Sequence, residues 1–294
     1  MNIGIAGTGR MGTAIAGRLL QQGCNVTVWN RTPGKTTALA AAGANVSATA
    51  TQLAQACDIV LTILTDAAAV DAVYNGVSGL LTGDVKGKLF LEMSTVTPET
   101  QRTLALKVKA KGASMLDCPV GGTVGPAREG KLYAFVGGDA ADVERARPLL
   151  EKMCRRIEHL GAIGAGATLK LAANLTTQVW WHTFGEALAL CKPLNLPPER
   201  LMSIFMDTSG ATDVLKRRHP DIAAALAGNE PKLAGFDIES VHKDVRTMLD
   251  AAKSQGCELP VTQCVADVLD QAIRDGHGAA DCTSLPAMWV RKAR

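Results

Sequence analysis

Four residues of one long apolar segment have a spacing that brings them to one side of a helix. Lys170, Asn174, Thr177 and Trp181 are separated by four, three and four positions. Positions three and four apart are neighbours on a helix surface. Such a stripe faces either a ligand site or a satisfied buried network. Because lysine is rarely buried without a partner, we favour a ligand site with Lys170 as the candidate reactive group.

A glycine-rich motif of the form G-x-G-x-x-G lies near the N-terminus. It follows the apolar run IGIA and opens a helix expected over residues 11–22. In this context Gly7 permits a tight turn, Gly9 lets backbone amides approach a pyrophosphate, and Gly12 lets helix and strand pack closely. The helix N-terminus supplies N–H groups for phosphates. The motif predicts a dinucleotide site made by Gly7, Thr8, Gly9, Arg10, Met11 and Gly12.

The end of the second expected strand indicates which dinucleotide binds. An NAD site usually has Asp or Glu there to bind the ribose 2′-hydroxyl, whereas this chain has Asn30, Arg31 and Thr32, with Lys35 shortly after. A 2′-phosphate needs cations and hydroxyl donors, which these residues can supply. The alternative is that Arg31 and Lys35 are ordinary surface charges. The pattern favours NADP(H) over NAD(H).

Other polar or glycine-rich segments follow expected strands. In open α/β folds, ligands bind at the carboxyl ends of the strands. Met93-Ser94-Thr95 places small hydroxyls there; Leu64 ends another expected strand and Thr65 follows it, and we expect both to contact the cofactor. The segment from Asp117 to Thr123 contains Gly121 and Gly122, and consecutive glycines can form a nest of N–H donors for an oxyanion. The alternative for this segment is a flexible loop.

The elements that must position these residues fall into two parts. Short apolar runs alternate with helical segments up to about residue 160, which predicts a parallel sheet covered on both faces. The run GAIGAGA then precedes a long helix over about residues 167–191, and the rest reads as helices and loops. We expect a Rossmann domain over residues 1–162 and an all-α domain over residues 163–294, with a small-molecule site in their cleft. The expected strands are residues 3–6, 26–29, 59–64, 89–92, 115–117 and 133–136.

The composition excludes several classes of protein. Of 294 residues, 47% are hydrophobic and 20% charged, which is typical of a globular protein rather than a disordered one. The net charge of +3 comes without a concentrated basic face, so we expect no nucleic-acid partner. Eight scattered cysteines, with no C-x-x-C pair, predict neither a zinc site nor a disulfide framework. With no signal peptide or bilayer-spanning run expected, we predict a cytoplasmic protein.

Taken together, these motifs resemble those of the β-hydroxyacid dehydrogenases, the group containing 3-hydroxyisobutyrate dehydrogenase and tartronate semialdehyde reductase. The resemblance covers essentially the full length and is specific only in combination. Its segments are GTGRMG with NRT, the MST run, DCPVGGTVGPAREGKL, GAGATLKLAANL and FDIESVHKD. The resemblance implies a Rossmann domain followed by an all-α domain of the 6-phosphogluconate dehydrogenase-like type.

The resemblance also implies a role for particular residues. Lys170 is similar to the catalytic lysine, and Asn174 to its partner in holding the substrate. Gly122 and Thr123 correspond to the anchor for the acid group, and Thr95 to a residue beside the nicotinamide ribose. Lys243 corresponds to a residue that closes over the cofactor. The substrate-binding residues implied are Gly121, Gly122, Thr123, Asn174, Thr177 and Gln178.

The chain departs from the family pattern at the substrate loop. Most members carry Ser-Gly-Gly where this chain has Gly121-Gly122-Thr123. A Gly-x-Thr loop resembles the sulfolactaldehyde reductases, but they have an arginine at the position of Gly122. The usual paired asparagines after the lysine are Ala173-Asn174 here. The expected substrate is therefore a small aldehyde or hydroxy acid bearing a carboxylate or a sulfonate.

The predicted reaction is a reversible NADP(H)-dependent hydride transfer between a small aldehyde or keto acid and its hydroxy acid. Lys170 serves as acid and base, no metal takes part, and the enzyme forms a homodimer or homotetramer. An imine reductase shares the architecture but usually has another residue at the lysine position. A decarboxylating phosphogluconate dehydrogenase is longer. A non-catalytic NADPH-binding interaction module is the alternative from another class, and the retention of Lys170 and Asn174 disfavours it.

Overall fold

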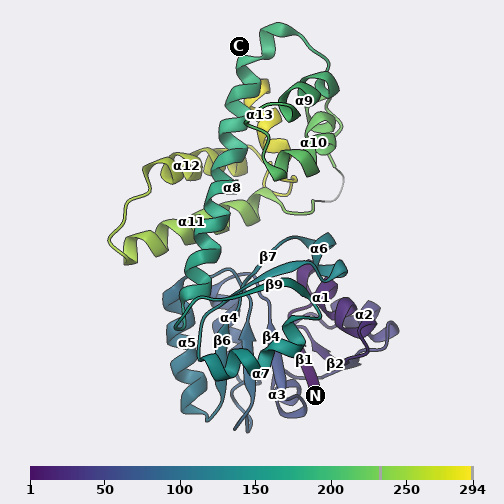
Figure 1. The fold of residues 1–294 in the computed structure, drawn as a ribbon, viewed down its shortest axis with the longest axis vertical. Coiled ribbons are helices and arrows are strands. Elements are labelled where there is room, and N and C mark those ends of the chain that lie inside the picture. The colour runs from purple at the N-terminus through teal and green to yellow at the C-terminus, as the bar shows by residue number, and fades with distance from the viewer. Residues whose placement is uncertain (232–233, 293–294) are drawn as a thin grey trace. The chain divides into compact units, whose positions relative to one another are not determined.

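The computed structural model describes residues 1–231 and 234–292, which divide into two compact units (Figure 1). The first unit spans Met1–Leu171 and the second begins at Ala172. The domain boundary at residues 162 and 163 stays a prediction.

In the first unit the strands are β1 (Asn2–Ala6), β2 (Asn25–Trp29), β3 (Asn45–Val46), β4 (Ile59–Thr62), β5 (Leu89–Glu92), β6 (Ser114–Asp117), β7 (Val120–Gly121), β8 (Leu132–Val136) and β9 (Cys154–His159). Its helices are α1 (Arg10–Gln21), the 3₁₀ turn η1 (Pro33–Thr36), α2 (Thr37–Ala41), α3 (Ala50–Ala56), α4 (Ala67–Asn75), α5 (Pro98–Ala110), α6 (Val124–Glu129) and α7 (Ala140–Leu150).

Six of these strands form one parallel sheet in the order β3-β2-β1-β4-β5-β6. Ile3 pairs with Val26 of β2 on one side and with Ile59 of β4 on the other. The strand order therefore reverses at β1 and β4, the place where dinucleotides bind in doubly wound sheets. The Rossmann fold predicted from the alternating pattern is confirmed.

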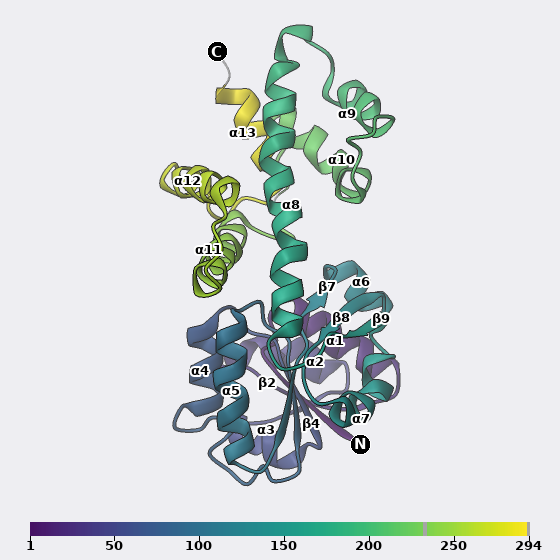
Figure 2. The same cartoon turned by 60° about the vertical axis from the view of Figure 1, so that its left-hand side comes forward.

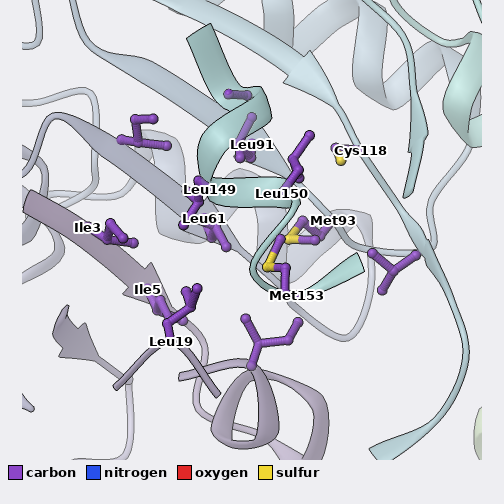
Figure 3. Close-up of a cluster of buried hydrophobic side chains, with 14 of the residues drawn as sticks. Ile3, Ile5, Leu19, Leu61, Leu91, Met93, Cys118, Leu149, Leu150 and Met153 are labelled. Atoms are coloured by element: carbon purple, nitrogen blue, oxygen red, sulfur yellow. The ribbon is translucent and has the colours of Figure 1, made fainter. Parts of the chain in front are cut away.

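Both faces of this sheet are covered by helices, as a parallel sheet requires. One buried cluster joins the strands to α1 and α7, and Figure 3 shows Ile5, Leu61 and Leu91 packing beside Leu149 and Met153. A second cluster joins the opposite face to α3, α4 and α5. Figure 2 shows α4 and α5 on one side of the sheet and α7 on the other. Helices on both faces leave the carboxyl ends of the strands as the edge from which loops can reach a ligand.

The predicted strand at residues 133–136 does not join this sheet. As β8, it lies between β7, to which it is antiparallel, and β9, to which it is parallel, in a separate three-stranded sheet. β7 lies within the segment predicted to bind the substrate. This segment is therefore held at one end by β6 of the large sheet and paired with β8 of the small one.

The second unit is built from helices in the part of the chain that the structure describes. The long helix α8 (Ala165–Leu190) leads into it from the first unit, confirming the helix predicted there. The helices that follow are the 3₁₀ turn η2 (Lys192–Leu194), α9 (Pro198–Met206), α10 (Asp213–Leu226), α11 (Ile238–Ser254), α12 (Pro260–Arg274) and α13 (Ser284–Lys292). None of the helices described is both long and apolar enough to cross a membrane.

Trp181, predicted at the end of the polar stripe on α8, belongs instead to the core of the helical unit. Its side chain is 3% exposed and lies in a cluster with Phe184, Leu188 and Met202. Its ring meets that of Trp180 edge to face, with 4.9 Å between centroids. Helical spacing alone cannot separate a site-facing aromatic from a core one, because both follow the same period.

His182 lies in this unit as a buried, neutral imidazole. It is 4% exposed, and among the described residues neither ring nitrogen has a hydrogen-bond partner. The Trp289 ring packs edge-on, 6.4 Å from it between centroids. Burial lowers the pKa of His182 to about 4 from its ordinary 6.5. The imidazole thus packs within the helical unit as an uncharged side chain.

We therefore expect acid to weaken the helical unit through His182. The unfolded chain takes up a proton near pH 6.5 and the folded unit near pH 4, so stability is complete above 6.5 and falls as the pH drops toward 4. Between pH 7 and 5 this loss is about 2 kcal/mol. The free energy of unfolding can be measured in urea by the fluorescence of Trp180 and Trp181. Between pH 7 and 5 it should fall by about 2 kcal/mol less in His182→Leu than in the wild type. His219→Leu, at the surface of α10, is the control and should unfold like the wild type; a His182→Leu variant that does so too would contradict the prediction.

Candidate functional site

The glycine-rich loop connects β1 to α1 at the point where the strand order reverses. Gly7 has a φ of +101°, and a Cβ there would lie 2.4 Å from the Ile63 carbonyl oxygen. A Cβ on Gly12 would lie 1.9 Å from the Gly7 carbonyl oxygen. Both positions thus require glycine, one for its conformation and one for the close packing of α1 on the loop.

The start of α1 has the features needed to receive a phosphate. A Cβ on Gly9, the residue before the helix, would meet no atom within 4 Å, so the backbone is open to a ligand there. No side chain of the described residues caps this end of α1 by a hydrogen bond. Amide groups at a helix start and the positive end of its dipole favour an anion. The loop therefore fits a dinucleotide pyrophosphate.

Asn30, directly after β2, links the glycine-rich loop to the segment that follows β2. The Thr8 backbone N–H donates to Asn30 Oδ1 at 3.0 Å, and Asn30 Nδ2 donates to the Thr32 carbonyl at 3.1 Å. The Thr8 hydroxyl donates to the Lys35 carbonyl at 3.1 Å. Asn30 thus has a positioning contact that its residue type alone did not indicate. Arg31, Thr32 and Lys35 are exposed beside the loop, where a ribose 2′-phosphate could reach them.

A buried network, absent from the sequence predictions, holds the loops after β4 and β5. Glu92 is fully buried and accepts hydrogen bonds from the Ser94 hydroxyl and from Gln101 Nε2. The Ser94 hydroxyl also accepts from the Leu64 N–H at 2.8 Å. Burial raises the pKa of Glu92, and these donors oppose the rise. Because its amide is already bonded, Leu64 can meet a cofactor only through its side chain or carbonyl.

The remaining predicted residues of these loops lie near the network. Thr65 is exposed and its hydroxyl donates to Asp66 Oδ2 at 3.1 Å, while Asp66 Oδ1 accepts from the Ala69 N–H and so caps α4. Thr95 is half-buried directly after Ser94. Both threonines thus follow parallel strands, β4 and β5, at the edge that carries the glycine-rich loop.

The predicted substrate loop combines a short strand with an exposed turn. Gly121 ends β7, and Gly122 is exposed with a φ of +119°, a conformation that favours glycine. Thr123 is exposed in front of α6, and its hydroxyl makes no capping bond to that helix. The loop therefore presents a hydroxyl and a glycine backbone, as binding an acid group requires.

Lys170 lies in the second turn of α8, within the first unit. Its side chain is only 8% exposed. A buried lysine must make polar interactions, so its place is specified rather than incidental. Among the described residues, no group of three or more His, Cys, Asp or Glu side chains could hold a metal ion.

The other predicted residues belong to the helical unit, where Asp244 joins two of them. Asp244 is 4% exposed on α11; its Oδ1 lies 2.5 Å from Lys243 Nζ, and its Oδ2 accepts from Asn174 Nδ2 at 3.4 Å. Thr177 is half-buried and Gln178 is buried, both on α8. Asp244 was missed from the sequence, although its place directly after Lys243 was a signal for it.

Comparison with known proteins agrees with this architecture. Residues 2–161 match the family model of the NAD binding domain of 6-phosphogluconate dehydrogenase. Residues 164–289 match the model described as NAD-binding of NADP-dependent 3-hydroxyisobutyrate dehydrogenase. The chain belongs to the β-hydroxyacid dehydrogenase family.

Curated relatives and solved structures extend this result over the chain. A 3-hydroxyisobutyrate dehydrogenase of Pseudomonas aeruginosa is 33% identical over 88% of each chain. A 3-sulfolactaldehyde reductase of Escherichia coli is 31% identical over 96% of this chain and 94% of its own. The structure of a Mycobacterium tuberculosis 3-hydroxyisobutyrate dehydrogenase with L-serine is 26% identical, covers 98% of each chain and superimposes with a TM-score of 0.83. The chain is accordingly an oxidoreductase with a domain for a nicotinamide cofactor.

Proposed function

We propose that this protein is an NADP(H)-dependent dehydrogenase that interconverts a small aldehyde or keto acid and the corresponding hydroxy acid. The observation that carries the proposal is Lys170, a buried lysine on the helix that begins within the dinucleotide-binding unit. Membership of the β-hydroxyacid dehydrogenase family supports the reaction class. The family resemblance implies a homodimer or homotetramer, and we propose that the enzyme is cytoplasmic.

In this mechanism Lys170 moves the proton that accompanies the redox step. A bound nicotinamide supplies the hydride in reduction and accepts it in oxidation. During reduction, the Lys170 ammonium gives its proton to the developing alkoxide and stabilises its charge; during oxidation, the neutral amine takes the proton of the substrate hydroxyl. Asn174 holds the substrate, and its contact with Asp244 fixes the orientation of its amide. Lys243, which pairs with Asp244, is the residue that the family resemblance assigns to the cofactor.

The substrate loop determines which acid is bound. We assign the acid group to the backbone of Gly121 and Gly122 and to the Thr123 hydroxyl, with Thr177 and Gln178 lining the substrate. Gly122 stands where the sulfolactaldehyde reductases have an arginine, so this loop lacks the cation that those enzymes present at that position. This supports a carboxylate rather than a sulfonate as the acid group.

The cofactor assignment rests on Asn30, Arg31, Thr32 and Lys35. No acidic side chain stands at the end of β2 to select the 2′-hydroxyl of NAD, and Arg31 and Lys35 are exposed cations there. The pyrophosphate binds to the loop of residues 7–12, and the nicotinamide half to Leu64, Thr65 and Thr95. These positions follow β1, β2, β4 and β5, which end at one edge of the sheet.

A screen of NADPH oxidation across short aldehyde acids tests this proposal directly. Succinic semialdehyde and glyoxylate represent the carboxylates, and sulfolactaldehyde the sulfonates. We expect turnover with at least one carboxylate and a lower kcat/KM with the sulfonate. Turnover of cyclic imines in place of aldehydes would support an imine reductase, and binding of NADPH without turnover of any substrate would support an interaction module.

A further inference from the structure

Asp117 joins the end of β6 to the start of α8 through both of its carboxylate oxygens. Oδ1 accepts from the Gly164 N–H and Oδ2 from the Ala167 N–H, each at 2.8 Å. Gly164 directly precedes α8 and Ala167 is its third residue. These are N–H groups that a helix leaves unsatisfied at its start and that an N-cap side chain normally binds. Because Gly164 has no side chain, a residue 47 positions away supplies the cap.

The same residue is fixed at its other end. Asp117 is fully buried, and its backbone exchanges hydrogen bonds with Gly137, after β8, at 3.0 and 2.8 Å. A Cβ on Gly137 would lie 2.2 Å from Asp117 Oδ1, and one on Gly166 would lie 3.0 Å from Oδ2. Small residues on both sides thus allow the carboxylate to reach the helix start.

Asp117 also connects the two groups proposed to act in the reaction, the substrate loop and Lys170. The segment predicted to bind the acid group runs from Asp117 itself to Thr123, and Lys170 lies three residues after Ala167 on α8. A rotation or shift of the first turn of α8 would therefore move Lys170 relative to that loop. We infer that Asp117 is a positioning residue that holds Lys170 in register with the substrate loop by capping α8. This inference rests on the proposed function.

The charge of the carboxylate fits this role. A negative group at a helix start is stabilised by the unpaired N–H groups and by the helix dipole. Burial raises the pKa of Asp117 to about 6, and the N–H groups of Gly164 and Ala167 oppose the rise. At neutral pH the side chain is therefore ionised and accepts at both oxygens. An amide in its place offers one acceptor oxygen and turns a donor toward the other N–H group.

Variants of the full-length chain test the inference, with Asp117→Asn as the isosteric change and Asp117→Ala as the larger one. Asp139→Ala is the matched control, because Asp139 caps α7 by accepting from the Ala141 N–H at 2.9 Å. With the substrate that the wild type turns over, we expect kcat to fall on the order of 100-fold in Asp117→Ala through misplacement of Lys170. The KM for substrate and the Kd for NADPH should change far less than kcat. The fall in kcat should be smaller in Asp117→Asn than in Asp117→Ala. A purely structural role predicts lower stability with kcat unchanged per folded molecule, and that result overturns the inference.

Amide hydrogen exchange gives a second readout that does not depend on turnover. Loss of the cap should speed exchange over residues 164–171 by roughly fivefold in both Asp117 variants. The Asp139→Ala control should speed it only at the start of α7. Unchanged exchange over residues 164–171 overturns the inference, even where no aldehyde acid proves to be a substrate. Faster exchange there supports the cap in that case too, so failure of the proposed function and failure of this inference are distinguishable.

Discussion

Replacing Lys170 by alanine is expected to abolish most turnover while leaving NADPH binding intact. Proton transfer by a placed side chain contributes roughly 10²–10⁴-fold to a rate, and Lys170 also stabilises the developing alkoxide. We therefore expect kcat to fall about 10³-fold or more. The Kd for NADPH, measured by fluorescence titration, should stay within about twofold, since the loops that hold the phosphates lie elsewhere in the unit.

Two further variants separate proton transfer from a simple loss of charge. Lys170→Arg keeps a cation but places a group that does not give up its proton near neutral pH, so it should not restore kcat. Lys253→Ala, at the exposed end of α11, removes a lysine from the surface and should behave as the wild type. Full activity in Lys170→Ala would contradict the proposed role of Lys170 as acid and base. Normal NADPH binding in an enzyme that never turned over would instead indicate an interaction module.

The large sheet could be predicted from sequence because its strands are apolar runs. Leu89, Phe90 and Leu91 are all buried, and such an apolar run between helical segments is typical of a strand covered on both faces. The strands that were missed lack this pattern. β9 has the sequence CRRIEH with several exposed side chains, and β3 and β7 are two residues long. Neither length nor hydrophobicity distinguishes such strands from loops.

The candidate site likewise contains features that the sequence indicates and contacts that only the structure shows. Gly7, Gly9 and Gly12 act within one turn, so their spacing alone indicates what they do. The contacts of Asp117 with Gly164 and Ala167 and of Asn174 with Asp244 span 47 to 70 residues. Such contacts follow from how the chain folds back on itself, and periodicity within one segment carries no record of them. The sequence therefore pointed to a candidate reactive group, whereas the long-range contacts of Asp117 and Asp244 came only from the structure.

Arg31 allows the cofactor preference to be tested by one change. Arg31 is exposed after β2, in the segment that Asn30 ties to the glycine-rich loop. Removing a charge-assisted hydrogen bond to a phosphate costs about 1.5–3 kcal/mol, and a carboxylate in its place adds repulsion. Converted into a ratio of dissociation constants, the lost hydrogen bond and the added repulsion should raise the Kd of Arg31→Asp for NADPH about 100-fold or more. The Kd for NADH should change little or fall, because Asp can accept from the ribose 2′-hydroxyl.

The ratio of the two changes, rather than either alone, decides the assignment. Arg156→Asp is the matched control: Arg156 is an exposed arginine of the same unit, on β9, paired with Glu158. It reverses the same surface charge away from the glycine-rich loop, so it measures the long-range effect of charge on both cofactors. Since NADPH differs from NADH only by the 2′-phosphate, a loss of NADPH affinity beyond that of the control locates the phosphate at Arg31. Equal losses for NADPH and NADH in Arg31→Asp would show that Arg31 is an ordinary surface charge and that the preference for NADP(H) has another origin or does not exist.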